Sequence, residues 1–500
     1  MISASDRVRL IFGLKLRQLR QDKGLQINEL ADLAGISPSY LNEIEKGKKY
    51  PKSEKIFALA KVLDTHYDNL VSVSLGKRLE PIEELLNSNI LQELPLELFG
   101  LEAADLLRML SEAPVKLGAF VSTVIEISRN HGLNVEQFYF SALRSFQELH
   151  DNYFEEIEDI AGTFIRAYLP ENEVTFREEW LKEHLEKSYD YRIIEFDEME
   201  KPELTGIRSV VLPGSPAIML VNRHLGAKQR AFTFGREIGF RLMELSPRPY
   251  ISSQTEAESF DQVLNNFKAS YFAGAILVPR ESLVMGLAGF FARASWRPEK
   301  FLDLMNTFDA TPEIFMHRIS NIMSRHFGVH EIFFLRFDKE THSQVFRLTK
   351  EMHTAKLPFI HSSANEHYCR RWVSLTILDE LAQLQEDKKW DGSALCQAQI
   401  ADFIDTSSSY LLISLAKDSP PREGYNSSVS LGFPLNERVK TLIRFLDDPR
   451  LVRKGVNQTC ERCRLEACRE RSFPPVIWRR QQRNKTLKEL IPGLRETLIS

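Results

Sequence analysis

The 500-residue sequence has few cysteines and no long apolar segment, and both absences narrow the class of protein. Five cysteines are too few for a disulfide framework, and the odd count argues further against an exported protein. No apolar run approaches the roughly 18–20 residues of a membrane span. Residues 1–6 lack the basic and apolar regions of a secretory signal. We therefore expect a cytoplasmic protein with no membrane partner.

The small net charge of −4 hides an uneven distribution along the chain. Residues 1–80 hold 14 Lys and Arg against 10 Asp and Glu, and residues 450–500 hold 13 against 5. The remainder is acidic, so any surface that binds a polyanion should be local. At about 150 residues per domain, the length predicts three or four domains.

The first 75 residues have the pattern of five short helices. Gly35 and Ile36 form a turn between the second and third helices, followed by Ser37 as N-cap and Pro38 at the first helical position. The third helix should end near Lys46, with Gly47 at its C-terminus. The second and third helices each carry apolar residues, which would pack the two helices against each other at a steep angle. These residues are Leu30, Ala31, Ile36, Leu41 and Ile44.

Residues 25–47 resemble the Xre/Cro, phage-repressor-like helix-turn-helix family. That family places the second helix of the motif in the major groove of operator DNA. Ile27 stands where the family usually has a glutamine, a departure that affects one contact and not the fold. The resemblance implies DNA contacts by the outward-facing residues Gln26, Asn28, Ser37, Ser39, Tyr40, Asn42, Glu43, Lys46, Lys48 and Lys49.

Residues 76–168 are expected to form a helical linker and dimerisation region, interrupted near Pro95 and Pro114. Its last helix, from about Val135, is expected to be long. Apolar and aromatic residues recur in steps of three and four from Leu143 to Phe164, close to a heptad seam. The seam suits either an internal core helix or a dimerisation helix.

Residues 169–328 change to a mixture of strands and helices. We expect a strand at Tyr191–Phe196, a hairpin across Pro213–Pro216 and a helix from about Ala227 to Glu244. The segments Gln229–Phe240 and Ala269–Pro279 resemble the ImmA/IrrE-type zinc peptidase domain.

In active members of that family, the motif H-E-x-x-H holds zinc and its glutamate deprotonates a water. Here Arg236 and Phe240 occupy the two histidine positions, Glu237 remains, and the expected acidic ligand falls near Asn266 and Lys268. The resemblance therefore implies a zincin-like pseudo-peptidase without metal ligands, and a protein that is not an enzyme. The domain is either an inert scaffold or a binding site for an anionic ligand, with Arg236, Glu237 and Arg241 as ligand-binding residues.

Residues 329–500 are expected to form a mixed α/β domain, with strands near 331–337, 344–348, 410–415 and 429–433. Cys460, Cys463 and Cys468 lie within nine residues, a spacing typical of a metal or redox site in a reducing compartment. A zinc ion would need a fourth donor, for which Cys369 is the first candidate and Cys396 the second. The alternative is three thiols without a ligand.

The cysteines and the following Arg471–Pro475 resemble the C-terminal domain of the short-chain fatty acyl-CoA regulator family. With the two resemblances above, this one covers nearly the whole chain in order, although Cys369-Arg370-Arg371-Trp372 lacks the proline of the family's Cys-Pro-x-Trp element. It implies a multidomain α+β bacterial transcription factor that binds double-stranded operator DNA and a short-chain acyl-CoA. The implied role is control of glyoxylate or propionate metabolism. Alternatives are a metallopeptidase that acts on a repressor, and a DNA-binding antitoxin or scaffold without a ligand.

Overall fold

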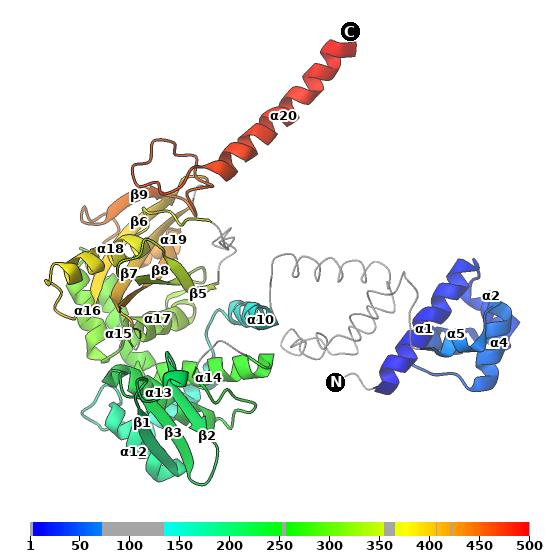
Figure 1. The fold of residues 1–500 in the computed structure, drawn as a ribbon, viewed down its shortest axis with the longest axis horizontal. Coiled ribbons are helices and arrows are strands. Elements are labelled where there is room, and N and C mark those ends of the chain that lie inside the picture. The colour runs from blue at the N-terminus through cyan, green and yellow to red at the C-terminus, as the bar shows by residue number, and fades with distance from the viewer. Residues whose placement is uncertain are drawn as a thin grey trace. The chain divides into compact units, whose positions relative to one another are not determined.

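The computed structural model describes residues 4–72, 135–252, 257–354, 366–406, 408–420, 422 and 424–499 (Figure 1). These residues divide into two compact units, one of residues 1–146 with 257–261, the other of residues 147–256 with 262–500. The predicted breaks near Pro95 and Pro114 lie outside the described residues. Among the described residues, no single helix is long and apolar enough to cross a membrane, and only the bent pair α14–α15 passes that test jointly.

The first unit contains the five predicted short helices. They are α1 (Ala4–Asp22), α2 (Ile27–Ala34), α3 (Pro38–Glu45), α4 (Ser53–Leu63) and α5 (Tyr67–Val71). Their apolar faces meet in one core that includes Leu16, Leu30, Leu41 and Ile44. The helical pattern of the sequence therefore predicts this unit correctly, because each short helix buries one apolar face.

The long helix predicted from Val135 is wrong, because the structure breaks it in two. Helix α10 (Val135–Leu149) and helix α11 (Glu155–Tyr168) flank Asp151 and Asn152, whose φ angles are 50° and 53°. This left-handed backbone cannot continue a right-handed helix. The seam from Leu143 to Phe164 is therefore not one surface of one helix, and it gives no support to a dimer.

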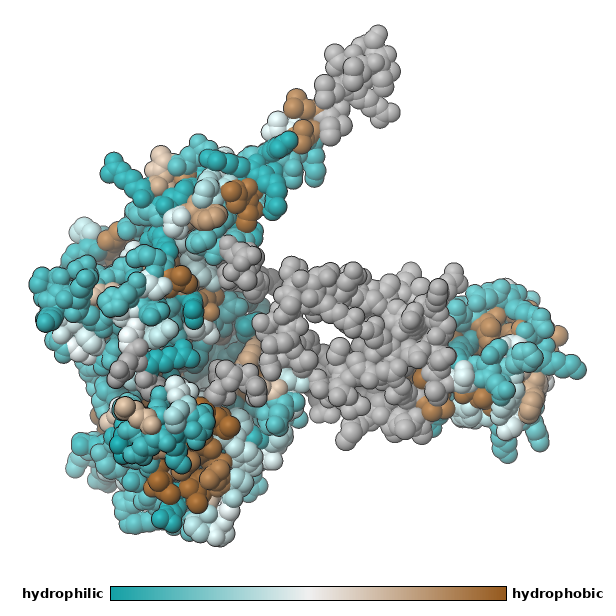
Figure 2. Space-filling view, in the orientation of Figure 1, coloured by the Kyte–Doolittle hydropathy of each residue, from teal (hydrophilic) through white to brown (hydrophobic). Residues whose placement is uncertain are grey.

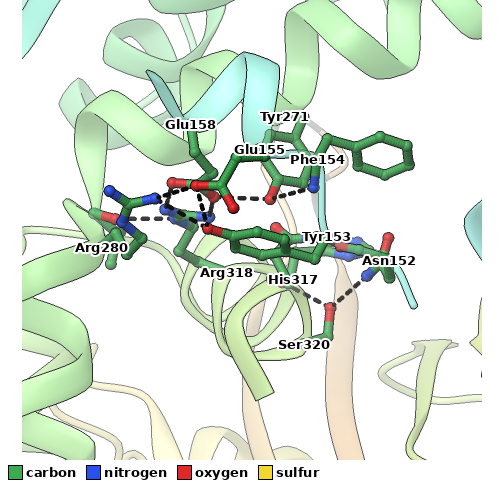
Figure 3. A network of polar contacts seen from close by, with 12 residues as sticks. Asn152, Tyr153, Phe154, Glu155, Glu158, Tyr271, Arg280, His317, Arg318 and Ser320 are labelled. Carbon is green, nitrogen blue, oxygen red and sulfur yellow. Dashed lines mark hydrogen bonds and ion pairs between the residues drawn. The ribbon is translucent and has the colours of Figure 1, made fainter. Parts of the chain in front are cut away.

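Helix α11 belongs to the core of the second unit. Glu158 on α11 forms a buried ion pair with Arg318, whose Nη2 lies 2.7 Å from Oε2, and the Tyr271 hydroxyl donates to Glu158 at 2.7 Å (Figure 3). Ile157 and Phe164 are buried in the same core. The predicted linker therefore extends too far toward residue 168.

A three-stranded sheet follows α12 (Glu178–Tyr189). Strand β3 (Ala217–Asn222) lies between β1 (Tyr191–Phe196), to which it is parallel, and β2 (Ser209–Leu212), to which it is antiparallel. Helix α13 (Ala227–Leu242) begins directly after this sheet. The predicted strand, hairpin and helix are all present.

The larger sheet has six strands in the order β5-β4-β8-β7-β6-β9, antiparallel except for the β6–β9 pair. Helix α18 (Val373–Glu386) covers one face of this sheet, where it packs against the β4 residues Phe333, Leu335 and Phe337. The opposite face of the sheet, which includes Phe334, packs into the main core. The strands are β4 (Phe333–Glu340), β5 (Arg347–His353), β6 (Leu395–Phe403), β7 (Ser409–Asp418), β8 (Tyr425–Pro434) and β9 (Val452–Val456).

The remaining helices link and cover the two sheets. They are α14 (Phe260–Leu277), α15 (Arg280–Phe291), α16 (Pro298–Thr307), α17 (Pro312–Phe327), α18 (Val373–Glu386), α19 (Glu437–Leu442) and α20 (Val476–Ile499). One continuous core contains residues from Ile157 to Leu451. The domain border predicted at residues 328–329 therefore falls inside a single core.

Candidate functional site

The turn between α2 and α3 is built by local chemistry. Gly35 has a φ of +63°, a left-handed conformation that glycine adopts without a steric penalty. The Ser37 hydroxyl accepts a hydrogen bond from the Tyr40 backbone N–H at 3.2 Å, and Pro38 occupies the first turn. These contacts fix the direction of α3, the predicted recognition helix.

Helix α3 is held against α1 by a buried ion pair and a close backbone approach. Arg20 donates two hydrogen bonds to the Glu45 carboxylate, at 2.6 and 2.8 Å. A Cβ at Gly13 would lie 2.4 Å from the Ile44 carbonyl oxygen, so only glycine permits this crossing. The position of α3 is therefore determined at its C-terminal end as well as at its N-cap.

All ten residues predicted to contact DNA lie at the surface of this unit. Gln26, Asn28, Ser37, Ser39, Lys46, Lys48 and Lys49 are exposed, and Tyr40, Asn42 and Glu43 are partly exposed. Lys49 pairs with Glu43 at 2.7 Å, which raises the pKa of Lys49 and lowers the pKa of Glu43. Lys46 and Lys48 have no such partner among the described residues, and they are the better phosphate contacts.

In the second unit, helices α13 and α14 bring together two of the altered metal positions. Arg236 Nη1 donates to Asn266 Oδ1 at 3.4 Å. The third position, Phe240, lies one turn beyond Arg236, and the Arg248 guanidinium sits 4.0 Å from the centre of its ring. A cation, an aromatic ring and an amide therefore occupy the three places.

Glu237 is buried and fully engaged. Arg248 donates to both carboxylate oxygens, at 2.6 and 2.5 Å, and the Tyr191 hydroxyl donates to Oε1. Burial and the neighbouring Glu237 raise the pKa of Tyr191 to about 12. Arg241 donates to the Tyr191 hydroxyl at 2.7 Å and is otherwise exposed. Glu237 therefore forms its ion pair with Arg248 and not with Arg236 or Arg241.

Arg236 itself is incompletely paired. Its Nε is buried and has no hydrogen-bond partner in the described part of the chain. Burial lowers the pKa of Arg236 to about 10, with Glu237 opposing the shift and the cations Arg248 and Arg208 adding to it. An anionic ligand would supply the missing acceptor and relieve this repulsion.

A second group of charges faces this one from α17, β4 and β5. Glu313 lies 3.0 Å from Arg336 Nη1 and also pairs with Lys350. The His317 ring stacks on Phe334 at 3.9 Å between ring centres and is 39% exposed. Burial among surrounding atoms and the charge of Lys350 lower the pKa of His317 to about 4.

Arg208, just before β2, joins the two groups. Its charge affects the pKa of both Arg236 and Glu313, and no ion pair or side-chain hydrogen bond is recorded for it among the described residues. We call the set formed by Arg208, Arg236, Arg248, Arg336, Lys350, Glu237, Glu313 and Asp338 the inner charge cluster. Its five cations exceed its three carboxylates. Figure 2 shows that the surface of the second unit is largely hydrophilic, with a hydrophobic patch as well.

The predicted ligand-binding residues differ in their relation to the inner charge cluster. Arg236 and Glu237 belong to it, whereas Arg241 lies at its edge beside Tyr191. Phe234, on the same helix, is buried in the main core. Sequence reasoning missed Arg208 and Lys350, since no motif marks them and only tertiary pairing brings them here.

Three of the cysteines meet where residues 367–369 run beside residues 458–460. Cys369 N–H donates to the Gln458 carbonyl at 3.1 Å, and Cys460 N–H donates to the His367 carbonyl at 2.8 Å. Burial raises the pKa of the Cys369 thiol to about 11, and Cys460 and Cys463 add to the shift. Cys369 is therefore the cysteine outside the motif that approaches it.

The other predicted features of the cysteine site are absent from this arrangement. Cys468 lies 3.6 Å from Glu470, and Cys396 lies on β6 against the main core. Nearby arginines have other partners: Arg462 pairs with Glu366, and Arg471 donates to backbone carbonyls. Among the described residues, no three His, Cys, Asp or Glu side chains are placed so that they could hold a metal ion. As placed, the four predicted cysteines do not fit a zinc site.

Comparison with known proteins gives matches to the first unit. A family model described as helix-turn-helix matches residues 16–70. RghRB of Bacillus subtilis, an uncharacterized HTH-type transcriptional regulator, is 42% identical over 64 residues, which are 13% of this chain and 46% of that protein. The transcriptional regulator ClgR of Mycobacterium tuberculosis is 36% identical over 78 residues, 16% of this chain and 69% of that protein. A solved Mycobacterium tuberculosis transcriptional regulator is 18% identical, with a TM-score of 0.46 over 67% of this chain and 93% of its own.

Proposed function

Because this chain belongs to the helix-turn-helix family of transcriptional regulators, we propose that it is a homodimeric regulator whose affinity for operator DNA changes when a short-chain acyl-CoA binds. The DNA-binding domain supplies the first half of this function. Proteins of this type bind two half-sites about one helical turn apart, so a two-fold dimer should select an inverted repeat. The role in short-chain carbon metabolism, of glyoxylate or propionate type, is what the resemblance to the short-chain fatty acyl-CoA regulator family implies.

The inner charge cluster is the observation that carries the ligand half of the proposal. Arg208 has no recorded partner among the described residues, and Arg236 keeps a buried Nε without one. Arginines with free donors bind phosphate well, because the planar guanidinium forms two parallel hydrogen bonds. The phosphates of CoA match this chemistry. The acyl group would also need an apolar contact, and the Phe240 ring that lies under Arg248 is itself buried.

We further propose that the second unit does not hydrolyse peptides. In a zinc peptidase the glutamate must be free to take a proton from water. Here Glu237 accepts three hydrogen bonds from Arg248 and Tyr191, and Arg236 holds a positive charge at a metal position. A peptidase that cleaves a repressor is therefore the weaker alternative, and a scaffold without a ligand is the other.

Titration calorimetry with acetyl-, propionyl- and butyryl-CoA tests the proposal directly. The wild-type protein should bind at least one of them below roughly millimolar concentration, and the double variant Arg208→Gln with Arg236→Gln should lose most of that affinity. Arg241→Gln is the matched control, because Arg241 is exposed at the edge of the cluster and should retain more binding. If no acyl-CoA binds the wild-type protein, the scaffold function takes the place of the sensor.

A further inference from the structure

Helix α20 presents a basic surface that the rest of the second unit does not use. Residues 479–490 are exposed throughout. This stretch contains five cations, Arg479, Arg480, Arg483, Lys485 and Lys488, against the single carboxylate Glu489. No ion pair is recorded for these five side chains within the described residues, whereas Arg462 and Arg464 of the preceding loop pair with Glu366 and Asp405. The helix therefore carries uncompensated positive charge.

The arrangement of these cations separates two kinds of partner. Arg479, Arg480 and Arg483 share one side of the helix, because residues three and four apart are neighbours on its surface. Lys485 and Lys488 are also neighbours. Between Arg479 and Thr486 the helix contains no apolar residue, and the exposed apolar residues Leu487 and Leu490 lie beyond this stretch. The part that carries Arg479, Arg480 and Arg483 therefore has no apolar seam for a helix–helix contact. The charge favours a polyanion over a second copy of the chain.

The start of α20 is fixed to the cysteine-containing loop. The backbone N–H groups of Ile477 and Trp478 both donate to the Glu461 carbonyl at 3.0 Å. Arg471 donates to the carbonyl of Cys460 at 2.6 Å and to that of Cys463 at 3.1 Å. The basic stretch therefore extends from a fixed base.

We propose that α20 is a second DNA contact of this regulator, which binds the phosphate backbone of double-stranded DNA without reading its sequence. The proposal rests on the DNA binding of the helix-turn-helix domain. Helix α20 would add an electrostatic contribution to the affinity for DNA. Lys and Arg that neutralise phosphates release condensed counterions, so their contribution falls as salt rises. Contacts of this kind position a protein on DNA and carry no sequence information.

Fluorescence anisotropy with a 30-base-pair duplex of unrelated sequence, measured over a series of salt concentrations, tests the proposal. The full-length variant Arg479→Gln, Arg480→Gln, Arg483→Gln should bind this duplex more weakly. The slope of log K against log salt should decrease in magnitude by about 2–3, because each lost phosphate contact removes about 0.9. The matched control is Lys182→Gln, Lys187→Gln, Lys201→Gln, which removes the same charge from exposed positions elsewhere.

The proposal is overturned if the α20 variant and the control bind with the same affinity and the same slope. Unchanged thermal unfolding of both variants ensures that the comparison concerns DNA and not folding. A loss of self-association without a change in the salt slope would also overturn it, in favour of a protein partner. The variant Asn42→Ala with Lys46→Ala separates the two DNA contacts, because it should lose operator preference while the contribution of α20 to the salt slope remains.

Discussion

Arg236 on α13 donates a hydrogen bond to Asn266 on α14, 3.4 Å away, at two of the positions that the ImmA/IrrE resemblance assigns to metal ligands. Helices α13 and α14 bring the two residues together, and neither side chain is a typical zinc ligand. Arg236 keeps a buried Nε without a partner among the described residues. Arg236 therefore offers a buried hydrogen-bond donor to an anion at this place.

The ion pair between Arg248 and Glu237 should be a main contribution to the stability of the second unit. Arg248→Ala would leave a buried carboxylate without its two strongest donors, and removal of one partner of a buried pair costs about 3–5 kcal/mol. Urea unfolding measures the loss. Arg241→Ala should cost much less, because Arg241 is exposed, and equal stability of Arg248→Ala and wild type would contradict the assignment.

The stability of the second unit should fall between about pH 6.5 and pH 4 because of His317. Its folded pKa is lowered to about 4, whereas an unfolded histidine titrates near 6.5. Over this window the unfolded chain binds a proton that the folded chain does not, so acidification favours unfolding. His317→Gln should flatten the dependence of the unfolding midpoint on pH over this window. An unchanged profile would show that His317 is not enclosed as described.

The recognition surface of α3 can be tested on an operator selected from random duplexes. Asn42→Ala and Lys46→Ala should together weaken specific binding, by roughly 1–3 kcal/mol per lost base contact. Gel-shift titrations with the operator and with an unrelated duplex separate the two kinds of contact. Asp32→Ala, on the exposed side of α2, serves as a control. Unchanged operator affinity in the double variant would remove α3 from the major groove.

The metal content of the protein should show whether the cysteines bind a zinc ion or remain free thiols. From its spacing we predict about one zinc per chain, which requires Cys468 to turn from Glu470 toward Cys369, Cys460 and Cys463. Elemental analysis of reduced protein should find this zinc, and Cys460→Ser with Cys463→Ser should abolish it. Protein that contains no metal would agree with the present arrangement of the side chains and would favour a thiol cluster.

Local chemistry in the sequence predicts part of this architecture and fails at identifiable places. Gly35, Ser37 and Pro38 specify the turn of the DNA-binding motif by themselves, so that motif was predictable. Asp151 and Asn152 end α10, a turn signal that the heptad-like pattern concealed. Strand β9 was missed because it pairs with β6 about fifty residues earlier, and no local pattern reveals such a partner.

Some residues of the candidate ligand site could be found from the sequence, and others could be found only from the fold. Arg236 and Glu237 could be proposed from the sequence because the ImmA/IrrE resemblance places them at the positions of its metal motif. Arg208 directly precedes strand β2, Arg248 lies in the loop after α13, and Lys350 lies on strand β5 of the larger sheet. Only the fold of the chain places these three residues near the same cluster. A reading of charge along the sequence cannot find residues that converge in this way.

The most direct test of the account is the affinity for operator DNA measured with and without a saturating acyl-CoA. Coupling of about 1–3 kcal/mol between the two sites would change operator affinity by roughly 5–150-fold in the wild-type protein. Arg208→Gln with Arg236→Gln should bind the operator normally and lose this response. Operator affinity that is the same with and without every acyl-CoA tested would contradict the account, since a ligand that binds both conformations equally shifts nothing.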